Sequence, residues 1–437
     1  MTYTTMKFVI TGGKPLHGEI TLAGAKNAVS KVMVASLLTD EPCTLKNFPA
    51  IGEVDIIKEL LETIGSKVDV FGSTAKIHTP KIENSRVLQL TRKNRIPILA
   101  LGPLLARAGE AEVPVLGGDQ IGARPVDIHL EALAKLGAKI QITKSSYHAW
   151  AKDGLHGANI ELRFPSVGAT ENVILAAVLA HGETVVKNAA LEPEIIDLIK
   201  MLQNMGAIIE LSPPRTITIE GVKKLRGVTH HILPDRNEAV SFACLALATH
   251  GKILVKGAVQ EHLITFLNVV RRMGAEYEVG NEGITFWLPN GTMNPVSITT
   301  DVHPGFMTDW QQPLAVCMTQ ADGKSFIHET IYEDRFGYAK DLNTMGAKMI
   351  ISVDCPENEK CRFHGRGFHH YAMIEGKTKL RATNLKTRDL RSGMLDVIAA
   401  LVAEGTSEIE GVDEIDRGYE RIDERLRALG ANIERVR

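Results

Sequence analysis

Most side chains of this sequence that could do chemistry are cations at the predicted starts of helices or in glycine-rich loops. A helix start offers unpaired N–H groups and the positive end of the helix dipole, so a cation beside it makes a site for phosphate or carboxylate. Arginine adds a planar fork that holds such anions through two hydrogen bonds. The residues placed in this way are Lys26, Arg95, Arg124, Arg236, Arg335, Arg391 and Arg417, with Asn27 beside the first.

The recurrence of this placement carries more weight than any one arginine. A single arginine at a helix start is usually a solvated charge or the partner of a nearby carboxylate. Several repeated segments carry a cation at equivalent places, which favours a substrate with several negative charges. Two simpler alternatives stay open, because Lys26 could be a linker lysine and Asn27 an ordinary helix cap.

Two acidic residues could move protons. Asp119 lies in the segment VLGGDQIGARPVD, and its glycines predict a mobile loop over residues 114–125. Asp119 is either a turn residue or a proton donor whose pKa rises when the loop closes over a ligand. Asp309, in HPGFMTDWQQP, is either a helix N-cap or a base, and the spacing decides neither question.

The sequence gives little support for a metal or a cofactor. The spacing of cysteine and histidine in DCPENEKCRFHGRGFHHY is not that of a standard zinc site and favours a surface hairpin insertion. No P-loop or dinucleotide-binding glycine pattern follows a predicted strand, which argues against ATP hydrolysis and NAD chemistry. We therefore expect no metal and no cofactor. The potential ligands in this segment are Cys355, Cys361, His364, His369 and His370.

A helical segment that ends in a small-residue turn and a short strand recurs along the whole chain. Each copy has apolar residues at helical spacing, then a glycine that can end the helix in a left-handed conformation, then strand-like alternation. A more apolar helix precedes each copy, as in residues 173–180, and such helices belong inside the fold. The period is about 70 residues. The glycines that mark the six copies are Gly65, Gly137, Gly206, Gly274, Gly346 and Gly430.

The length of 437 residues favours two domains, because single cores stop growing beyond about 250–300 residues. The repeat predicts an α/β protein of compact βαβαββ-type units packed in two groups of three. A linker at residues 233–235 separates the third unit from the fourth, and an opening strand covers residues 8–21. We expect one domain of residues 1–22 plus 235–437 and a second of residues 23–234.

Nothing in the composition suggests a nucleic acid, a membrane or export. The formal net charge is -2, and no stretch approaches about 18 uncharged apolar residues. The N-terminal segment lacks the features of a secretory signal, and the five scattered cysteines fit reduced thiols. We expect a cytoplasmic protein that is a monomer or a weak homo-oligomer.

A series of motifs gives the chain an end-to-end resemblance to a known family. The motifs run from GAKNA through LGPLLAR, GGDQIGARPVDIHL, SVGAT, NAALEPEIID, LPDR, HPGFMTD, EDRF and DLR to IDRGYERIDERLRALGANI. In these residues the chain resembles the UDP-N-acetylglucosamine enolpyruvyl transferases. The resemblance implies an EPSP synthase-like fold, an inside-out αβ barrel of two three-unit domains. It implies UDP-N-acetylglucosamine and phosphoenolpyruvate as the small-molecule substrates.

The same resemblance implies roles for individual residues. Asp309 would take the proton from the sugar 3-hydroxyl and Asp119 would donate one. Residues matched to catalysis are Lys26, Asp119, Asp309 and Arg417. Those matched to phosphoenolpyruvate binding are Lys26, Asn27, Arg95, Arg124, Arg335, Arg391 and Arg417. Those matched to the UDP-sugar are Asn27, Arg95, Arg124, Pro125, Val126, Asp127, Ile128, Ser166, Val167, Gly168, Asp309 and Ile331.

The implied reaction is an addition followed by an elimination, the first committed step of peptidoglycan synthesis. Most of the family has a loop cysteine where this chain has Asp119, which removes the thiolate that fosfomycin alkylates, so we expect resistance to that drug. Phe164 and Arg388 also depart from the family pattern, and residues 354–379 look lengthened. Two alternatives stay open: an enolpyruvyl transferase for another uridine nucleotide or shikimate phosphate, and a non-catalytic paralogue that binds nucleotide sugars.

Overall fold

A computed structural model describes residues 6–92, 94–115, 117, 125–356 and 361–437. The chain forms two compact units, each with its own cluster of buried hydrophobic side chains. Unit 1 contains the described residues up to 23 and from 234 to the C-terminus. Unit 2 contains residues 24–117 and 125–233, apart from those outside the described ranges. The linker predicted at residues 233–235 thus falls where the chain passes from unit 2 to unit 1.

Unit 1 contains three four-stranded sheets, with the strand orders β21-β22-β1-β23, β15-β16-β14-β2 and β17-β18-β20-β19. Their strands are β1 (Lys7–Thr11), β2 (His17–Thr21), β14 (Lys252–Lys256), β15 (Glu276–Val279), β16 (Gly283–Trp287), β17 (Ser297–Thr299), β18 (Lys324–His328), β19 (Lys348–Ser352), β20 (Tyr371–Glu375), β21 (Asn384–Lys386), β22 (Thr406–Glu410) and β23 (Asn432–Val436).

Unit 2 repeats this plan with the strand orders β13-β3-β5-β4, β6-β8-β7 and β11-β12-β10-β9. Its strands are β3 (Cys43–Lys46), β4 (Lys67–Phe71), β5 (Thr74–His78), β6 (Glu110–Pro114), β7 (Lys139–Ile142), β8 (Ser146–Trp150), β9 (Asn159–Glu161), β10 (Glu183–Lys187), β11 (Ile208–Ser212), β12 (Thr216–Glu220) and β13 (Thr229–His231).

The same pairing pattern recurs in all six sheets. In each four-stranded sheet one parallel edge pair is followed by two antiparallel pairs, as in β9 with β10, β10 with β12 and β12 with β11. The three-stranded sheet keeps both antiparallel pairs, and a single parallel bridge from Arg86 to Glu112 stands where the fourth strand would be. This pattern confirms the prediction of six βαβαββ-type units, three in each half of the fold.

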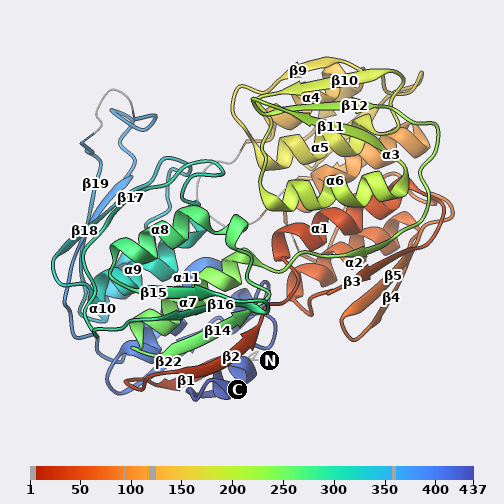
Figure 1. Ribbon diagram of the computed structural model, residues 1–437. Helices are drawn as coiled ribbons and strands as arrows, with labels where there is room; N and C mark the ends of the chain where they lie inside the picture. Colours follow the sequence, from red (N-terminus) through yellow and green to blue (C-terminus); the bar gives the residue numbers. More distant parts are fainter. Residues whose placement is uncertain (1–5, 93, 116, 118–124, 357–360) are drawn as a thin grey trace. The chain divides into compact units, whose positions relative to one another are not determined.

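One helix of each repeat is buried in the middle of its unit, and the sheets lie outside it (Figure 1). Every residue of α7 and α9 is buried, polar side chains included, because neighbouring helices and sheets cover both helices. This confirms the inside-out arrangement of helices and sheets. The central helices are α1 (Lys26–Ala35), α3 (Leu101–Ala108), α5 (Val167–Ala177), α7 (Arg236–Ala248), α9 (Gln311–Gln320) and α11 (Leu390–Val402).

The second helix of each repeat is followed by one of the six predicted glycines. All six have positive φ angles, from 78° at Gly274 to 117° at Gly65, which confirms the left-handed helix ends. The second helices are α2 (Gly52–Ile64), α4 (Asp127–Lys135), α6 (Pro193–Met205), α8 (Ile264–Arg272), α10 (Ala339–Thr344) and α13 (Ile422–Ala428). The remaining helical elements are α12 (Val412–Asp416), η1 (Ser36–Leu38), η2 (Ile96–Ala100), η3 (Gln260–His262) and η4 (Thr308–Trp310).

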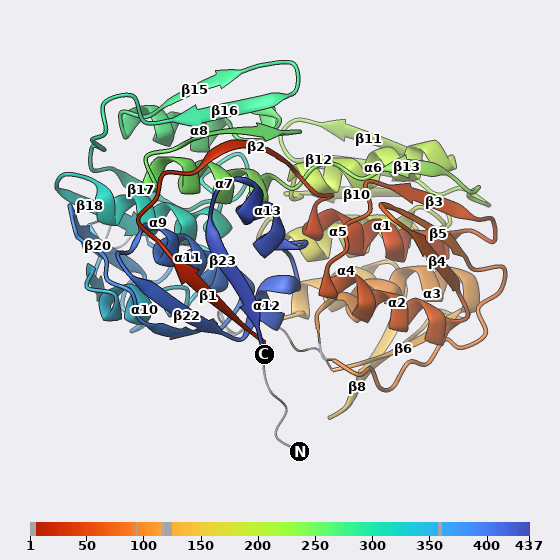
Figure 2. The same ribbon diagram turned by 90° about the horizontal axis from the view of Figure 1, so that it is seen from below.

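The opening of the chain differs from the prediction of one strand over residues 8–21. β1 and β2 are separate strands that belong to different sheets of unit 1. β1 pairs with both β22 and β23, whereas β2 is the parallel neighbour of β14 (Figure 2). Residues 12–16 carry the chain from one sheet to the next. Only glycine fits at residue 12, because a Cβ atom there would lie 2.2 Å from the Ala400 carbonyl oxygen.

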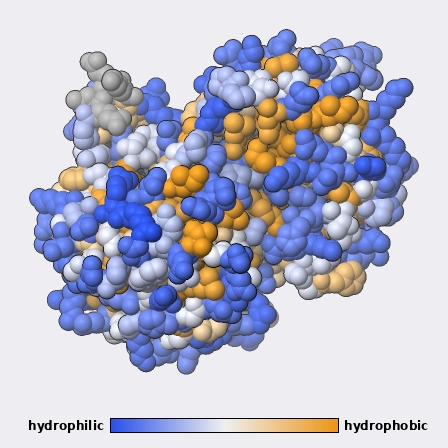
Figure 3. Space-filling model, viewed as in Figure 1, coloured by the Kyte–Doolittle hydropathy of each residue, from blue (hydrophilic) through white to orange (hydrophobic). Residues whose placement is uncertain are grey.

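Apolar side chains reach the surface at several places. On the side shown in Figure 3 many side chains are hydrophilic, and hydrophobic ones gather across part of unit 2 and in smaller patches on unit 1. Several exposed large apolar side chains lie on edge strands of different sheets, such as Phe71 on β4, Ile142 on β7 and Ile350 on β19. No helix within the described ranges is long and apolar enough to cross a lipid bilayer.

Candidate active site

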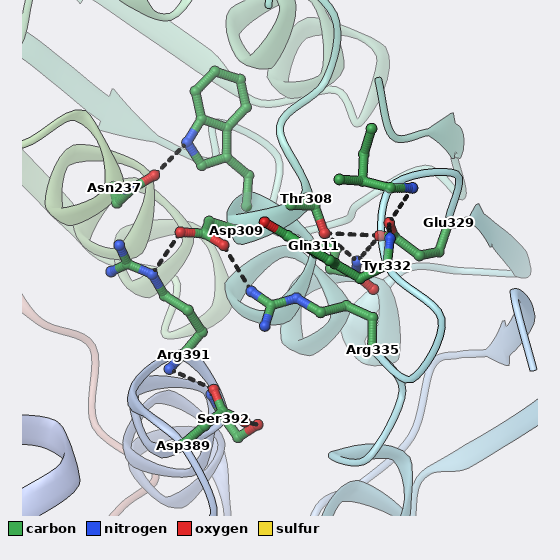
Figure 4. Close-up of polar contacts among 12 residues, drawn as sticks. Asn237, Thr308, Asp309, Gln311, Glu329, Tyr332, Arg335, Asp389, Arg391 and Ser392 are labelled. Atoms are coloured by element: carbon green, nitrogen blue, oxygen red, sulfur yellow. Dashed lines mark hydrogen bonds and ion pairs between the residues drawn. The ribbon is translucent and has the colours of Figure 1, made fainter. Parts of the chain in front are cut away.

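The Asp309 carboxylate bridges two arginines in unit 1 (Figure 4). Its Oδ1 atom accepts a hydrogen bond from Nη2 of Arg335 at 2.7 Å, and its Oδ2 atom accepts one from Nε of Arg391 at 3.1 Å. The triad joins two cations to one anion, so it keeps an excess of positive charge. An acid that could accept a proton therefore lies directly beside groups that bind anions.

Local structure explains how these three side chains meet. Asp309 lies in η4, directly before the buried helix α9, and does not cap that helix, whose N-cap residue is Trp310. Arg391 is in the first turn of α11, where the Asp389 side chain caps the helix by accepting hydrogen bonds from the backbone of residues 391 and 392. Arg335 lies on the connection between β18 and α10. Asp309 is therefore not the N-cap residue of α9, which was one of the two alternatives left open by the sequence.

The two arginines are buried, and their partners keep them charged. The side chains of Arg335 and Arg391 are only 2% and 6% exposed. Burial alone would lower the pKa of Arg391, but Tyr419 and Asp309 outweigh it and the pKa rises. Nη1 of Arg391 also donates to the Tyr419 hydroxyl at 3.2 Å, which lies 2.8 Å from the Ser241 hydroxyl. These contacts tie the site to α7 and α11.

A buried carboxylate, Glu329, holds the loop beside the triad. Its Oε1 atom accepts hydrogen bonds from the backbone N–H groups of Ile331 at 2.6 Å and Tyr332 at 2.8 Å. Its Oε2 atom accepts one from the Thr308 hydroxyl at 2.8 Å, next to Asp309. Burial raises the pKa of Glu329, and these hydrogen bonds oppose the rise. The predicted sugar contact Ile331 is therefore fixed through its backbone.

Arg417 is the fifth predicted site residue described in unit 1. It follows α12 directly, and its Nη1 atom donates to Glu414 at 2.7 Å. Its side chain is 13% exposed, more than that of either arginine in the triad. The structure thus gives Arg417 a carboxylate partner on the preceding helix, α12.

In unit 2, Lys26 and Asn27 form the first turn of the central helix α1. The Lys26 ammonium lies 3.9 Å from a Glu53 carboxylate oxygen, and the two side chains are 17% and 5% exposed. Asn27 is half-buried and is not the N-cap residue, which is Ala25. Both side chains therefore lie at the positive end of a helix, as the sequence predicted.

A second group of predicted residues in unit 2 surrounds a histidine that the sequence analysis did not single out. His129, on α4, is buried, and its Nδ1 atom lies 3.3 Å from the Asn172 amide nitrogen. A Cβ atom added at Gly168 would lie 2.9 Å from the His129 ring, so glycine permits this close approach. Burial and, to a smaller extent, the nearby charge of Arg95 lower the pKa of His129 to about 4, and Asp127 opposes this shift.

The predicted nucleotide-binding residues lie at two helix starts beside this histidine. Val126 is the N-cap residue of α4, and the Ser166 side chain caps α5 by accepting from the backbone of residue 169. Helix starts of this kind favour anions such as a diphosphate. Arg163 forms ion pairs with Asp127 and Glu131. The residues placed at these two starts are Pro125, Val126, Asp127, Ile128, Ser166, Val167 and Gly168.

Two predicted residues, Asp119 and Arg124, lie outside the described residues. Three residues that complete the observed networks were missed, namely Glu329, Tyr419 and His129. Glu329 had a sequence signal, because it directly follows the strand-like run SFIH, and His129 stands in the first turn after ARPVD. Tyr419 had no such signal in the sequence, since a buried tyrosine near a helix end is usually part of the core.

Comparison with solved structures identifies the fold. The crystal structure of the enolpyruvyl transferase NikO from Streptomyces tendae matches with a TM-score of 0.85 at 23% identity, covering 99% of each chain. EPSP synthase from Acinetobacter baumannii matches with a TM-score of 0.72 at 18% identity, covering 99% of this chain and 100% of that one. The fold is therefore that of the enolpyruvyl transferases.

Sequence comparison identifies the family. The family model for EPSP synthase (3-phosphoshikimate 1-carboxyvinyltransferase) matches residues 10–426. The UDP-N-acetylglucosamine 1-carboxyvinyltransferase of Protochlamydia amoebophila is 45% identical, over 98% of this chain and 94% of that protein. The protein of the same name from Chlamydia pneumoniae is 47% identical, over 96% of this chain and 93% of that protein. The chain belongs to the EPSP synthase family.

Proposed function

We propose that the chain transfers the enolpyruvyl group of phosphoenolpyruvate to the 3-hydroxyl of UDP-N-acetylglucosamine and releases phosphate. The site geometry supports an anionic substrate beside a proton acceptor. One observation carries the choice of acceptor, namely identity of 45% along nearly the whole of a relative named UDP-N-acetylglucosamine 1-carboxyvinyltransferase. No cofactor takes part in this reaction.

Asp309 is the proposed base of the reaction. Its carboxylate is held by Arg335 and Arg391 at 2.7 and 3.1 Å, so it is fixed in position and can accept the proton of a sugar hydroxyl. We assign the two arginines, with Arg417, to the negative charges of phosphoenolpyruvate. Ile331 contacts the sugar in this proposal, because the Glu329 carboxylate fixes its backbone beside the base.

The chemistry is an addition followed by an elimination. A proton adds to C3 of phosphoenolpyruvate, C2 becomes electrophilic, and the sugar 3-oxygen forms a bond to C2 as it loses its own proton. The bond from C2 to the phosphate oxygen then breaks, and loss of a proton from C3 restores the double bond. Asp309 takes the hydroxyl proton, Asp119 is assigned the transfer at C3, and the fixed cations stabilise the departing phosphate.

The remaining assignments belong to unit 2. We assign Lys26, Arg95 and Arg124 to phosphate binding and Asn27 to the contact of both substrates. Lys26 and Asn27 lie in the first turn of α1, and Arg95 directly precedes η2. The two helix starts around His129 are assigned to the uridine diphosphate portion. The residues assigned to that portion are Arg124, Pro125, Val126, Asp127, Ile128, Ser166, Val167 and Gly168.

A phosphate-release assay with a panel of acceptors tests the proposal. Purified full-length protein is incubated with phosphoenolpyruvate and, separately, with UDP-N-acetylglucosamine, other UDP-sugars, shikimate 3-phosphate or no acceptor. We expect phosphate release with UDP-N-acetylglucosamine and background release with shikimate 3-phosphate. Faster release with a different acceptor would reassign the substrate, and binding of UDP-N-acetylglucosamine without release would indicate a non-catalytic protein.

We also propose that the reaction takes place in the cytoplasm. All five cysteines, Cys43, Cys244, Cys317, Cys355 and Cys361, are free thiols. Free thiols are typical of a reducing compartment. Localisation of a tagged full-length chain by fractionation of its native cells tests this assignment, and recovery of the protein outside the cytoplasmic fraction would contradict it.

A further inference from the structure

Four side chains with metal-binding atoms converge at one end of the β17-β18-β20-β19 sheet of unit 1. They are His328, Cys355, Cys361 and His370, and their nitrogen and sulfur ligand atoms all lie within 4.8 Å of one another. All four residues are buried, with exposed fractions of 3%, 6%, 7% and 0%. Histidine and cysteine drawn together inside a protein in this number form a set of ligands suited to a metal ion.

The sheet explains why residues so far apart in sequence meet. His328 is the last residue of β18, and its partner across the antiparallel pair is Tyr371, the first residue of β20. Tyr371 also pairs with Ser352, the last residue of β19. Cys355 follows β19 by three residues, and His370 directly precedes β20. Cys361 also lies between β19 and β20 in the sequence, and its sulfur atom belongs to the same group.

The hydrogen bonding of His370 prepares its ring for a metal. Its Nδ1 atom lies 2.8 Å from the Phe368 carbonyl oxygen, which can only accept, so Nδ1 carries the proton. Nε2 is then the basic nitrogen, and it is buried without a hydrogen-bond partner among the described residues. Metal-binding histidines show this arrangement, with one ring nitrogen donating to a carbonyl and the other facing the metal.

The spacing of the other ligand atoms also fits. Nε2 of His328 lies 3.2 Å from Sγ of Cys361. In a tetrahedral zinc site of two sulfur and two nitrogen atoms, neighbouring ligands are separated by roughly 3.3–3.8 Å. Contraction from the observed upper limit of 4.8 Å thus needs shifts of about 1 Å or less. The backbone N–H of Phe363 donates to the Cys361 sulfur at 3.5 Å.

A metal cross-link would stabilise the segment around Cys355 and Cys361, which has only a small hydrophobic cluster of its own. Cys355, Cys361 and Phe363 form a small buried cluster separate from the two large cores, with Tyr371 packed against it. A cluster of this size supplies little hydrophobic stabilisation, and small substructures commonly depend on a metal or a disulfide. A Cys355–Cys361 disulfide is the competing explanation, but it leaves the two imidazoles in the cluster without a role.

We propose that His328, Cys355, Cys361 and His370 bind one zinc ion as a structural site. Two thiolates and two neutral imidazoles complete a tetrahedral shell, so no position stays open for catalysis. The expectation of no metal is therefore replaced, and of the residues considered for it, His364 and His369 are not members of the cluster. The N–H of Glu329, next to His328, donates to the His370 carbonyl at 2.8 Å, so the ion also anchors the start of the active-site loop.

Metal analysis of the purified protein is the first test. Full-length protein purified without chelator or added metal is analysed for zinc and iron, and we expect about one zinc ion per chain. The double variant Cys355→Ser/Cys361→Ser should lose that zinc. Cys43→Ser, which changes a buried free thiol in unit 2, is the matched control and should retain it. Equal zinc in the wild type and the double variant, or iron instead of zinc, would overturn the proposal.

A second measurement needs no variant and therefore stands even if the double variant fails to fold. The wild-type protein is stripped with a chelator and titrated with Co²⁺ alone. We expect a thiolate-to-cobalt charge-transfer band, the visible bands of tetrahedral cobalt, and a melting temperature that falls on stripping and recovers with Zn²⁺. Absence of the charge-transfer band, or a Cys355–Cys361 disulfide in protein alkylated during purification, would exclude the site.

Discussion

The Nε–H of Arg391 donates to Oδ2 of Asp309 at 3.1 Å, although the two residues are 82 positions apart in the sequence. Arg391 lies in the first turn of the buried helix α11, and Asp309 lies in the turn before the buried helix α9. Those two helices pack directly on each other, so the core of unit 1 sets the distance between acid and cation. The precision of the site therefore depends on the packing of the repeat.

Replacing Asp309 by asparagine should abolish most of the activity. Asp309→Asn keeps the shape of the side chain but removes the proton acceptor, so we expect kcat to fall by roughly 10²–10⁴-fold. Steady-state phosphate release measures the effect, and circular dichroism checks the fold. Asp301→Asn is the matched control, because its exposed carboxylate contacts only the backbone of residue 302 among the described hydrogen bonds. A kcat within twofold of the wild type in Asp309→Asn would exclude Asp309 as the base.

Arg391→Lys should weaken the use of phosphoenolpyruvate even though it keeps the positive charge. A lysine cannot donate to Asp309 and Tyr419 in the geometry of the guanidinium, which makes both contacts. Loss of a charge-assisted hydrogen bond predicts a decrease of roughly 10–100-fold in kcat/KM for phosphoenolpyruvate. Arg381→Lys, at an exposed position of unit 1, should change little. Equal effects in both variants would show that Arg391 has no special role.

His129 should make the protein less stable as the pH falls. Its pKa is about 4 in the folded protein, below the ordinary value of 6.5, so the unfolded chain binds the proton more readily. The stabilisation is complete above pH 6.5 and is lost progressively as the pH falls toward 4. Between pH 7 and pH 5 this residue should lower the free energy of unfolding by on the order of 2 kcal/mol.

Urea unfolding of the wild type and of His129→Gln at these two pH values measures this contribution. Glutamine retains a side-chain amide near Asn172 but has no group that titrates in the range. The variant should therefore lose less stability than the wild type on acidification, whatever its stability at pH 7. The same pH dependence in both proteins would mean that His129 ionises equally well in the folded and unfolded states.

Fosfomycin should not inactivate the enzyme over time. The resemblance implies that Asp119 stands in place of the cysteine whose thiolate the drug alkylates. Intact-mass spectrometry after long incubation with fosfomycin and UDP-N-acetylglucosamine should show no adduct. Asp119→Cys should restore both the adduct and time-dependent inactivation. Inactivation of the wild type with a covalent adduct would contradict the assignment of the loop.

The sequence was a good guide to local features of the fold. Glycines such as Gly65 and Gly274 end their helices in left-handed conformations, because the chain neighbours that decide this are within a few residues. Strand pairing between segments that are far apart in the sequence was harder to predict. β3 takes its parallel neighbour from β13, and the opening segment is divided between two sheets, because long-range contacts decide both arrangements.

The same contrast between local features and long-range contacts applies to the candidate site. The positions of Lys26 and Arg391 in first helical turns were predictable, since a helix start can be identified from its neighbours. Arg417 instead follows the end of α12, and Arg335 lies on the connection between β18 and α10. Glu329 was missed because its importance depends on the backbone groups that fold around it. The proposed zinc site was missed because His328 stands on β18, well before the cysteine-rich segment, and only the register of β18 with β20 brings it there.

The most direct test of the proposed reaction is mass spectrometry of its product formed in deuterium oxide. With phosphoenolpyruvate and UDP-N-acetylglucosamine, the account predicts an enolpyruvyl ether of the nucleotide sugar and inorganic phosphate in equal amounts. It also predicts deuterium in the vinyl methylene group, because the addition step protonates C3 before the elimination removes a proton. Unchanged UDP-N-acetylglucosamine, with pyruvate and phosphate as the only products, would contradict the account.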